Sequence, residues 1–191
     1  MLRAMLAGIF VGGRATRMQG ATKPLLPTRE GEPLLTRTLR IARAAGLTPI
    51  LIGSAKLGEA AEGIPQYADT EPLVGPLSGF ATLLAHTHDA SCIALAGDMP
   101  YISQALLQRL ATESPAAAVL APRDPLTGKW HPLFARYQSA VVRPALASAL
   151  ANGARSFQAL FRTLSVVELA VSAAELETLH DWDRPEDMRH D

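Results

Sequence analysis

This sequence has one cysteine, no net charge and no long apolar run. The single cysteine, Cys92, excludes an internal disulfide framework and a cysteine-rich zinc site. Because 18 Lys+Arg balance 18 Asp+Glu, the net charge is +0, which disfavours a general nucleic-acid or membrane-surface binder. No apolar run approaches the roughly 18 residues of a membrane span. We therefore expect a cytoplasmic protein that binds neither nucleic acid nor membrane.

Apolar residues, by contrast, are abundant. They make up 48% of the 191 residues, which is enough for a hydrophobic core and predicts one domain over residues 1–191. The first apolar stretch has no small-residue cleavage site, so it predicts a strand rather than a signal peptide. Lys and Arg gather in residues 1–56, whereas acids crowd residues 175–191. This asymmetry suits a phosphate-binding first loop and metal-binding acids further on, and random surface scatter is the alternative.

Short apolar runs alternate with segments of helical periodicity. We expect strands over residues 5–11, 49–52, 92–96, 118–121, 132–137 and 166–171. Helices are expected between them, two of them capped by Ser103 and Ser156. This alternation predicts an α/β fold with a mostly parallel sheet and helices on both faces. Ligands bind beyond the carboxyl ends of such strands, which points to the loops after Val11, Ile52 and Ala96.

The loop after the first strand carries the strongest functional signal. Gly12 and Gly13 let backbone N–H groups approach an anion without obstruction by a Cβ. Arg14 and Arg17 add forked donors for phosphate oxygens, and Lys23 adds a compact charge. The spacing matches neither the dinucleotide-binding glycine pattern nor the phosphate loop of kinases and GTPases. We predict a phosphate site here, and a surface loop with solvated arginines is the alternative.

Asp98 stands just beyond the end of the third predicted strand, after Gly97. A carboxylate there is a hard oxygen ligand for Mg²⁺, and Pro100 would fix the turn that aims it. A turn acid that caps a helix is the alternative. Asp183 is a weaker candidate for a second metal ligand, since a solvated place in the acidic tail fits the sequence nearly as well.

Other reactive residue types give no competing site. His86 and His88 are two residues apart, so they point to different sides of a helix and make a poor metal pair. No G-x-S-x-G segment supports a Ser/His/Asp hydrolase. Cys92 stands among apolar residues, which predicts a buried and inert thiol.

Motifs spread over nearly the whole chain resemble those of one enzyme family. The first, G-G-x-x-x-R-M-x-G-x-x-K-P-L-L, begins at Gly12; the others are Asp69 with GPLSG at 75–79, GDMP at 97–100, HPL at 131–133, GARS at 153–156 and WDRPED at 182–187. Together they are similar to the molybdenum cofactor guanylyltransferases. The resemblance implies a Rossmann-like nucleotidyltransferase fold of three layers. It also implies an enzyme that transfers GMP from GTP to molybdopterin, with Mg²⁺ as cofactor and release of pyrophosphate.

The resemblance also implies roles for individual residues. The catalytic residues would be Lys23, Arg17 and Asp98, and the metal ligands Asp98 and, more weakly, Asp183. Asp69, Gly75 and Gly79 would line the base and ribose, with a plain turn that opens the next helix as the alternative. His131 would lie on the acceptor side, and a structural role is as compatible with a lone histidine. The nucleotide-binding residues would be Phe10, Val11, Gly12, Gly13, Arg14, Lys23, Gly53, Asp69, Gly75, Gly79 and Asp98.

The chain departs from the family pattern at several positions. Phe10-Val11 stands where the family has Leu-Ala, Thr22 where it has Asp, and Asp183 where it commonly has Asn. Gly53 replaces an asparagine that helps to hold the nucleotide. Because Gly53 has no side-chain donor, we expect the preference for GTP to be less strict.

Two alternatives to GMP transfer stay open. One is the same chemistry on other substrates, such as CTP with molybdopterin or a nucleoside triphosphate with a sugar phosphate. The other is a nucleotide-binding module without turnover, against which the presence of Arg17, Lys23 and Asp98 together argues. We expect a monomer that makes transient contacts with other cofactor-synthesis proteins or molybdoenzymes.

Overall fold

The computed structural model describes residues 4–12, 17–18, 21–69, 76–88 and 90–180. Seven strands form one sheet in the order β5–β4–β1–β6–β8–β7–β9, and β2 and β3 form a separate hairpin. The strands are β1 Leu6–Phe10, β2 Arg17–Met18, β3 Ala21–Thr22, β4 Thr48–Ile52, β5 Gln66–Tyr67, β6 Ser91–Ala96, β7 Val119–Ala121, β8 Phe134–Gln138 and β9 Val166–Glu168.

The large sheet is mostly parallel. β1 pairs in parallel with both β4 and β6, so Phe10 lies beside Ile52 on one side and beside Ala96 on the other. β8 runs antiparallel to β6 and β7, whereas β7 and β9 are parallel to each other. The predicted sheet is therefore confirmed, with β8 as a reversed strand inside it.

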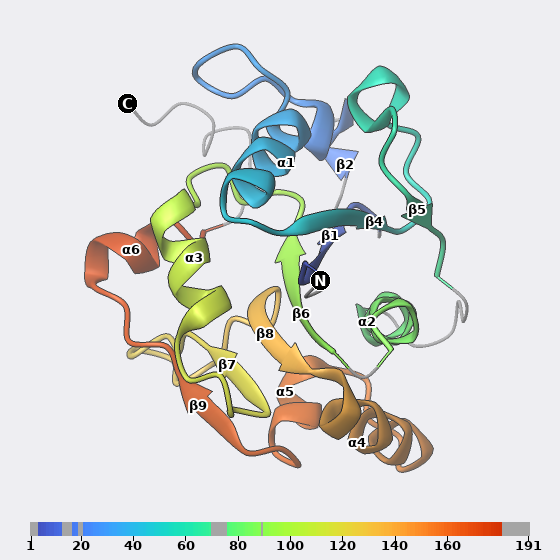
Figure 1. Cartoon of the computed structure of the whole chain (residues 1–191), viewed down its shortest axis with the longest axis vertical. Helices are drawn as coiled ribbons and strands as arrows, with labels where there is room; N and C mark the ends of the chain where they lie inside the picture. The colour runs from blue at the N-terminus through green and yellow to red at the C-terminus, as the bar shows by residue number, and fades with distance from the viewer. Residues whose placement is uncertain (1–3, 13–16, 19–20, 70–75, 89, 181–191) are drawn as a thin grey trace.

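Helices cover both faces of this sheet, as Figure 1 shows. α1 and α3 pack on one face with Ile9 and Leu95, and α2, α4 and α5 pack on the other with Cys92 and Ala94. Successive strand residues point to opposite faces, so β6 supplies both cores and the predicted three layers are confirmed. No described helix is long and apolar enough to cross a bilayer. The helices are α1 Leu34–Ala44, α2 Pro76–His86, α3 Gln104–Thr112, α4 Ser139–Ala151, α5 Phe157–Phe161 and α6 Ala173–Glu177, with the short 3₁₀ helices η2 Lys23–Leu25 and η3 Gly58–Ala61.

The predicted helix starts are confirmed at two places and wrong at a third. The hydroxyls of Ser103 and Ser156 accept hydrogen bonds from N–H groups one turn into α3 and α5, at 3.1 and 3.3 Å. Residues 76–79, expected as a turn before a helix, instead form the first turn of α2. Pro76 suits that place, because its missing N–H has no partner in the first turn of a helix.

Two strand boundaries differ from the prediction by more than one residue. β8 begins at Phe134 rather than at Pro132, because the N–H of Phe134 bonds to His131 O at 3.1 Å in a turn. β9 ends at Glu168 rather than at Val171.

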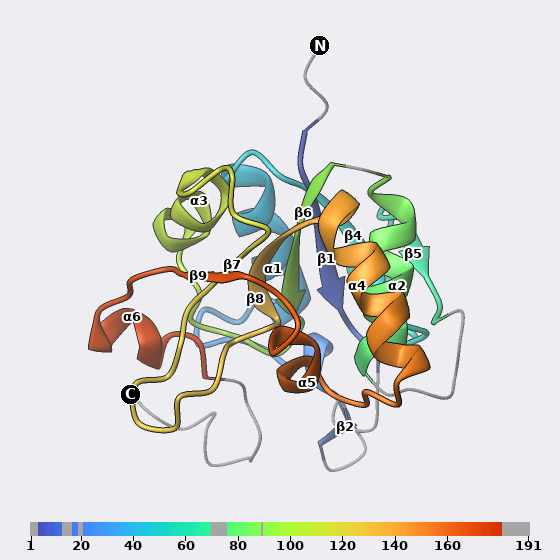
Figure 2. The ribbon, with the colours of Figure 1, turned by 90° about the horizontal axis from the view of Figure 1, so that it is seen from below.

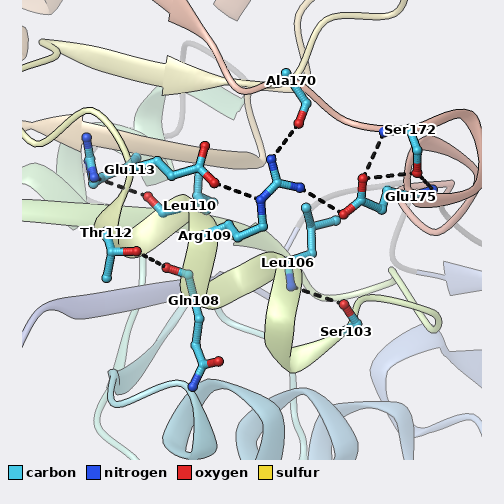
Figure 3. Close-up of polar contacts among 11 residues, drawn as sticks. Ser103, Leu106, Gln108, Arg109, Leu110, Thr112, Glu113, Ala170, Ser172 and Glu175 are labelled. Carbon is cyan, nitrogen blue, oxygen red and sulfur yellow. Dashed lines mark hydrogen bonds and ion pairs between the residues drawn. The ribbon is translucent and has the colours of Figure 1, made fainter.

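Arg109 connects α3 to the segment that includes α6 (Figure 3). From α3 its guanidinium donates to Glu113 at 2.7 Å, to Glu175 of α6 at 2.9 Å and to Ala170 O at 2.7 Å. The hydrogen bonds to the carboxylates raise the pKa of Arg109. This arginine therefore anchors the segment between β9 and α6 against α3.

Candidate active site

The carboxyl ends of three neighbouring strands meet at one edge of the sheet. β4, β1 and β6 end at Ile52, Phe10 and Ala96, which lie side by side in the parallel register. The loops that follow these strands therefore start at a common point, as the alternation of elements predicts. Figure 2 shows β1 pointing toward this edge, where β2 and the connection from β7 to β8 also lie.

Glycines allow the first two of these loops to touch. A Cβ on Gly53 would lie 2.6 Å from both Cα and N of Gly12, and Gly53 has a φ of +120°. A side chain at position 53 would therefore strain its own backbone and collide with the start of the loop after β1. The asparagine that the resemblance leads one to expect at this position therefore has no room here.

A third glycine brings β6 equally close to β1. A Cβ on Gly97 would lie 2.6 Å from Phe10 O, and the N–H of Gly97 donates to the same oxygen at 3.0 Å. Asp98 is thereby fixed directly beside the end of β1.

The side chains of Lys23 and Asp98 form an ion pair at this edge. Lys23 opens η2, Asp98 follows β6, and Nζ lies 3.5 Å from Oδ2 although 75 residues separate them. The Lys23 side chain is 3% exposed and that of Asp98 is 16% exposed. A charge buried to this degree needs compensation, because burial removes its hydration. The structure thus brings together the two charged residues that the sequence puts forward most strongly.

Arg17 is placed near this pair only through its backbone. In the hairpin, Arg17 pairs with Thr22, which directly precedes Lys23. Gly13, Arg14, Gly75 and Asp183 lie outside the described residues. Val11 is completely buried, so its contribution to the site is backbone.

Asp69, Gly79 and Phe10 converge from three elements. A Cβ on Gly79 of α2 would lie 3.1 Å from Asp69 Oδ1, 3.1 Å from Phe10 Cε1 and 3.0 Å from a methyl group of Ile52. Because Gly79 has no side chain, the Asp69 carboxylate and the Phe10 ring edge lie close to the backbone of α2. Desolvation by burial raises the pKa of Asp69. This wall stands on the β4 and β5 side of the edge.

Gln66 in β5 supports the candidate site, and no motif in the sequence singles it out. Its side-chain amide donates to Gly53 O and to Ala55 O, both at 2.9 Å, and the N–H of Gly53 donates to Tyr67 O at 2.8 Å. These bonds hold the loop that touches Gly12. A glutamine in a short edge strand carries no motif, and its partners are backbone oxygens that only the fold places.

The connection between β7 and β8 lies on the other side of Asp98. The N–H of Ala96 donates to Leu133 O at 2.8 Å, which ties the end of this connection to the end of β6. His131 is half-buried, and its N–H donates to Pro122 O at 3.0 Å across the connection. This segment therefore borders the site from the β8 side.

His86 and Cys92, for which the sequence predicts neither a metal site nor a reactive group, make contacts away from the candidate site. The His86 ring stacks on Tyr67, with centroids 3.6 Å apart. Cys92 is buried as predicted, and burial raises the pKa of its thiol to about 12. Among residues that the structure describes, no group of three His, Cys, Asp or Glu side chains is arranged to hold a metal ion.

The family model described as the MobA-like NTP transferase domain matches residues 7–168 of the chain. The chain belongs to this family. Its relatives include the molybdenum cofactor guanylyltransferase of Xanthomonas euvesicatoria pv. vesicatoria, 32% identical over 184 residues that cover 93% of this chain and 89% of that protein. The molybdenum cofactor guanylyltransferase of Pseudomonas putida (strain F1) is 32% identical over 190 residues, 94% of each chain. The enzyme is therefore a nucleotidyltransferase, and its family generally uses a divalent metal.

Solved structures confirm the fold. Molybdopterin-guanine dinucleotide biosynthesis protein A from Archaeoglobus fulgidus superposes with a TM-score of 0.74 at 23% identity, covering 97% of this chain and 95% of its own. The 2-C-methyl-D-erythritol 4-phosphate cytidylyltransferase of Thermus thermophilus gives 0.70 at 18% identity, covering 98% and 96%. Since enzymes with such different names share the architecture, the fold alone does not select the substrates.

Proposed function

We propose that the enzyme transfers GMP from GTP to molybdopterin and releases pyrophosphate, forming the guanine dinucleotide of the molybdenum cofactor. The observation that carries the proposal is the buried pair of Lys23 and Asp98 at the carboxyl ends of β1 and β6. The names of the relatives, 32% identical over almost the whole chain, support the choice of a guanine nucleotide and of the molybdenum cofactor as substrates. GTP is a cytoplasmic nucleotide, so we place the reaction in the cytoplasm.

The proposed step is an in-line displacement at phosphorus. A phosphate oxygen of the acceptor forms a bond to the α-phosphorus of GTP, and the bond from that phosphorus to the bridging oxygen of pyrophosphate breaks. Such transfer depends on positioning and on neutralising charge. Gly12, Gly13, Arg14 and Arg17 would bind the β- and γ-phosphates. Lys23 would lie against the α-phosphate, where an interaction that strengthens in the transition state accelerates the reaction.

The donor set of the site fits Mg²⁺. Asp98 offers a carboxylate that reaches solvent, and Mg²⁺ prefers one or two carboxylates together with phosphate oxygens and water. When bound, the ion would neutralise the triphosphate and polarise the α-phosphate. Asp183 stays a weaker second ligand of this proposal.

The wall formed by Asp69, Gly79 and Phe10, with Gly75 and Gly53, would hold the base and ribose. A carboxylate accepts hydrogen bonds from the N–H groups of a guanine or from ribose hydroxyls. Gly53 contributes only backbone, so we expect GTP to be favoured over CTP and ATP without strict exclusion of either.

The decisive experiment combines the enzyme with molybdopterin, Mg²⁺ and each of the four nucleoside triphosphates under anaerobic conditions. We expect the guanine dinucleotide and pyrophosphate, identified by mass analysis. A preference for CTP in competition would instead make the enzyme a cytidylyltransferase. Pyrophosphate release with a sugar phosphate but not with molybdopterin would overturn the assigned acceptor. Light scattering on the same preparation checks the proposed monomer, and co-purification with molybdoenzymes checks the proposed transient contacts.

A further inference from the structure

The connection from β7 to β8 carries an arginine and a tryptophan that the proposed phosphoryl chemistry does not use. The guanidinium carbon of Arg123 lies over the Trp130 ring, 5.3 Å from its centroid. Arg123 Nε donates to Gly128 O at 2.9 Å. A Cβ on Gly128 would come within 3.3 Å of Arg123 Nη2, and the φ of Gly128 is +67°, so glycine makes room for the guanidinium.

This pair is held rigidly although it is not part of the core. The side-chain amide of Gln158 donates to Trp130 O at 2.8 Å and accepts from Trp130 N at 3.3 Å. Arg123 and Trp130 also form a β-bridge, and the Asp124 carboxylate accepts from the N–H groups of Leu126 and Thr127. An exposed loop fixed by so many bonds loses little entropy when it binds a ligand.

Arg123 still has donors to offer. Its Nη groups make no hydrogen bond to the residues that the structure describes, since its guanidinium is held through Nε and through the Trp130 ring. A planar guanidinium combines hydrogen-bond donors with a face that stacks on aromatic systems. Such a group suits a flat heterocycle with carbonyl and ring-nitrogen acceptors.

The place of the pair along the sheet edge indicates which substrate it meets. The proposed nucleotide wall occupies the β5–β4–β1 side, and Lys23 and Asp98 lie between β1 and β6. β7 is two strands beyond β6, which is about 10 Å along the edge. The acceptor phosphate must reach the α-phosphate of GTP beside Lys23. Arg123, which follows β7 at this distance from β6, therefore faces the opposite end of the acceptor.

We propose that Arg123, supported by Trp130, is the subsite that recognises the fused heterocyclic ring of the acceptor. This inference rests on the proposed function, because it takes a pterin phosphate as the acceptor. Arg123 binds the ring, Trp130 supports the guanidinium, and Gln158 positions Trp130.

The kinetic test compares Arg123→Ala and Arg123→Lys with wild type. A charge-assisted hydrogen bond corresponds to about a tenfold effect or more, so we expect the KM for molybdopterin to rise at least about tenfold in both variants. Lysine keeps the charge but loses the planar fork, so a purely electrostatic role would leave Arg123→Lys near wild type. The KM for GTP should stay within about twofold. Arg43→Ala, at the carboxyl end of α1 and exposed, is the matched control.

A binding test separates this inference from the proposed function. The sequence has two tryptophans, Trp130 and Trp182, so a Trp182→Phe background makes Trp130 the fluorescent reporter. We expect phosphate-free pterin to quench Trp130 and inorganic phosphate to leave it unchanged, with weaker pterin binding after Arg123→Ala. If phosphate quenches and pterin does not, or if Arg123→Ala changes neither pterin binding nor the KM for molybdopterin, the inference is overturned. If wild type binds pterin here but makes no dinucleotide, the proposed function fails while the subsite stands.

Discussion

Replacing Asp98 should destabilise the enzyme more than replacing Lys23, although the two residues form one ion pair. The Lys23 side chain is 3% exposed and that of Asp98 is 16% exposed. Neutralising the carboxylate removes a partner from an almost fully buried ammonium, whereas removing the ammonium leaves a carboxylate that still reaches water. Breaking a buried pair costs about 3–5 kcal/mol, and the partial exposure of Asp98 lowers this figure.

We expect Asp98→Asn to lower the free energy of unfolding by about 2–4 kcal/mol. Lys23→Met keeps the apolar stem in place and should cost about 1 kcal/mol or less. Urea denaturation followed by circular dichroism, without nucleotide or Mg²⁺, measures both values. The double variant should be about 1–2 kcal/mol more stable than Asp98→Asn alone, because it has no buried ammonium to compensate.

The pair of the exposed Arg40 with Glu32 provides the control, since Arg40→Met should leave the free energy of unfolding almost unchanged. If Lys23→Met destabilises the enzyme as much as Asp98→Asn does, or if the two costs simply add, the reasoning from burial is refuted. Both variants should stay folded, because domains of this kind have about 5–15 kcal/mol of stability. In the same variants kcat should fall about 100- to 1,000-fold.

Three further predictions concern the nucleotide side of the site. Gln66→Leu removes both bonds that hold the loop after β4, so the KM for GTP should rise about five- to tenfold with little change in kcat, measured by steady-state kinetics. Gly53→Asn should lower the free energy of unfolding by about 2–4 kcal/mol, because its side chain would contact Gly12. The control is Gly58→Asn, since Gly58 has a φ of +55° and nothing within 4 Å of its Cβ position. In the same urea assay this control should lower the free energy of unfolding by less than about 1 kcal/mol. Burial raises the pKa of Asp69 above its ordinary 3.8, because the folded environment disfavours the ionised carboxylate. The stability contributed by the protonated form is therefore lost as pH rises through the pKa of the folded state. Asp69→Asn should therefore raise the free energy of unfolding at pH 7 and gain nothing below about pH 3, and an equal gain at both pH values would contradict this cause.

Much of the candidate site could be predicted because its signals are local. A buried strand that ends in paired glycines and cations, and another that ends in Asp98, can each be found in a short window of sequence. The rule that parallel strands present their carboxyl ends at one edge then predicts that these windows meet. The register of β1 with β4 and β6 confirms this part of the prediction.

The residues that the sequence does not single out depend on distant partners. Gln66 matters because the oxygens of Gly53 and Ala55 lie within its reach. Arg136 stands in the middle of β8, yet it is 2% exposed and donates to Leu110 O, Ala111 O and Ser114 O at the end of α3. Neither residue belongs to a motif, since backbone oxygens as partners leave no trace in the sequence.

The sequence by itself determined six of the seven strands of the large sheet and the helices α1 to α5, because hydrophobic periodicity and caps act between residues a few positions apart. It did not predict β5, the hairpin of β2 and β3, or α6. It also determined that cations follow the first strand and that a carboxylate follows the third. Only the tertiary structure decided that β8 runs against its neighbours, that Lys23 and Asp98 meet in a nearly dry environment, and that position 53 has no room for a side chain. These features arise where segments up to 75 residues apart are pressed together, and such contacts depend on how the whole core packs.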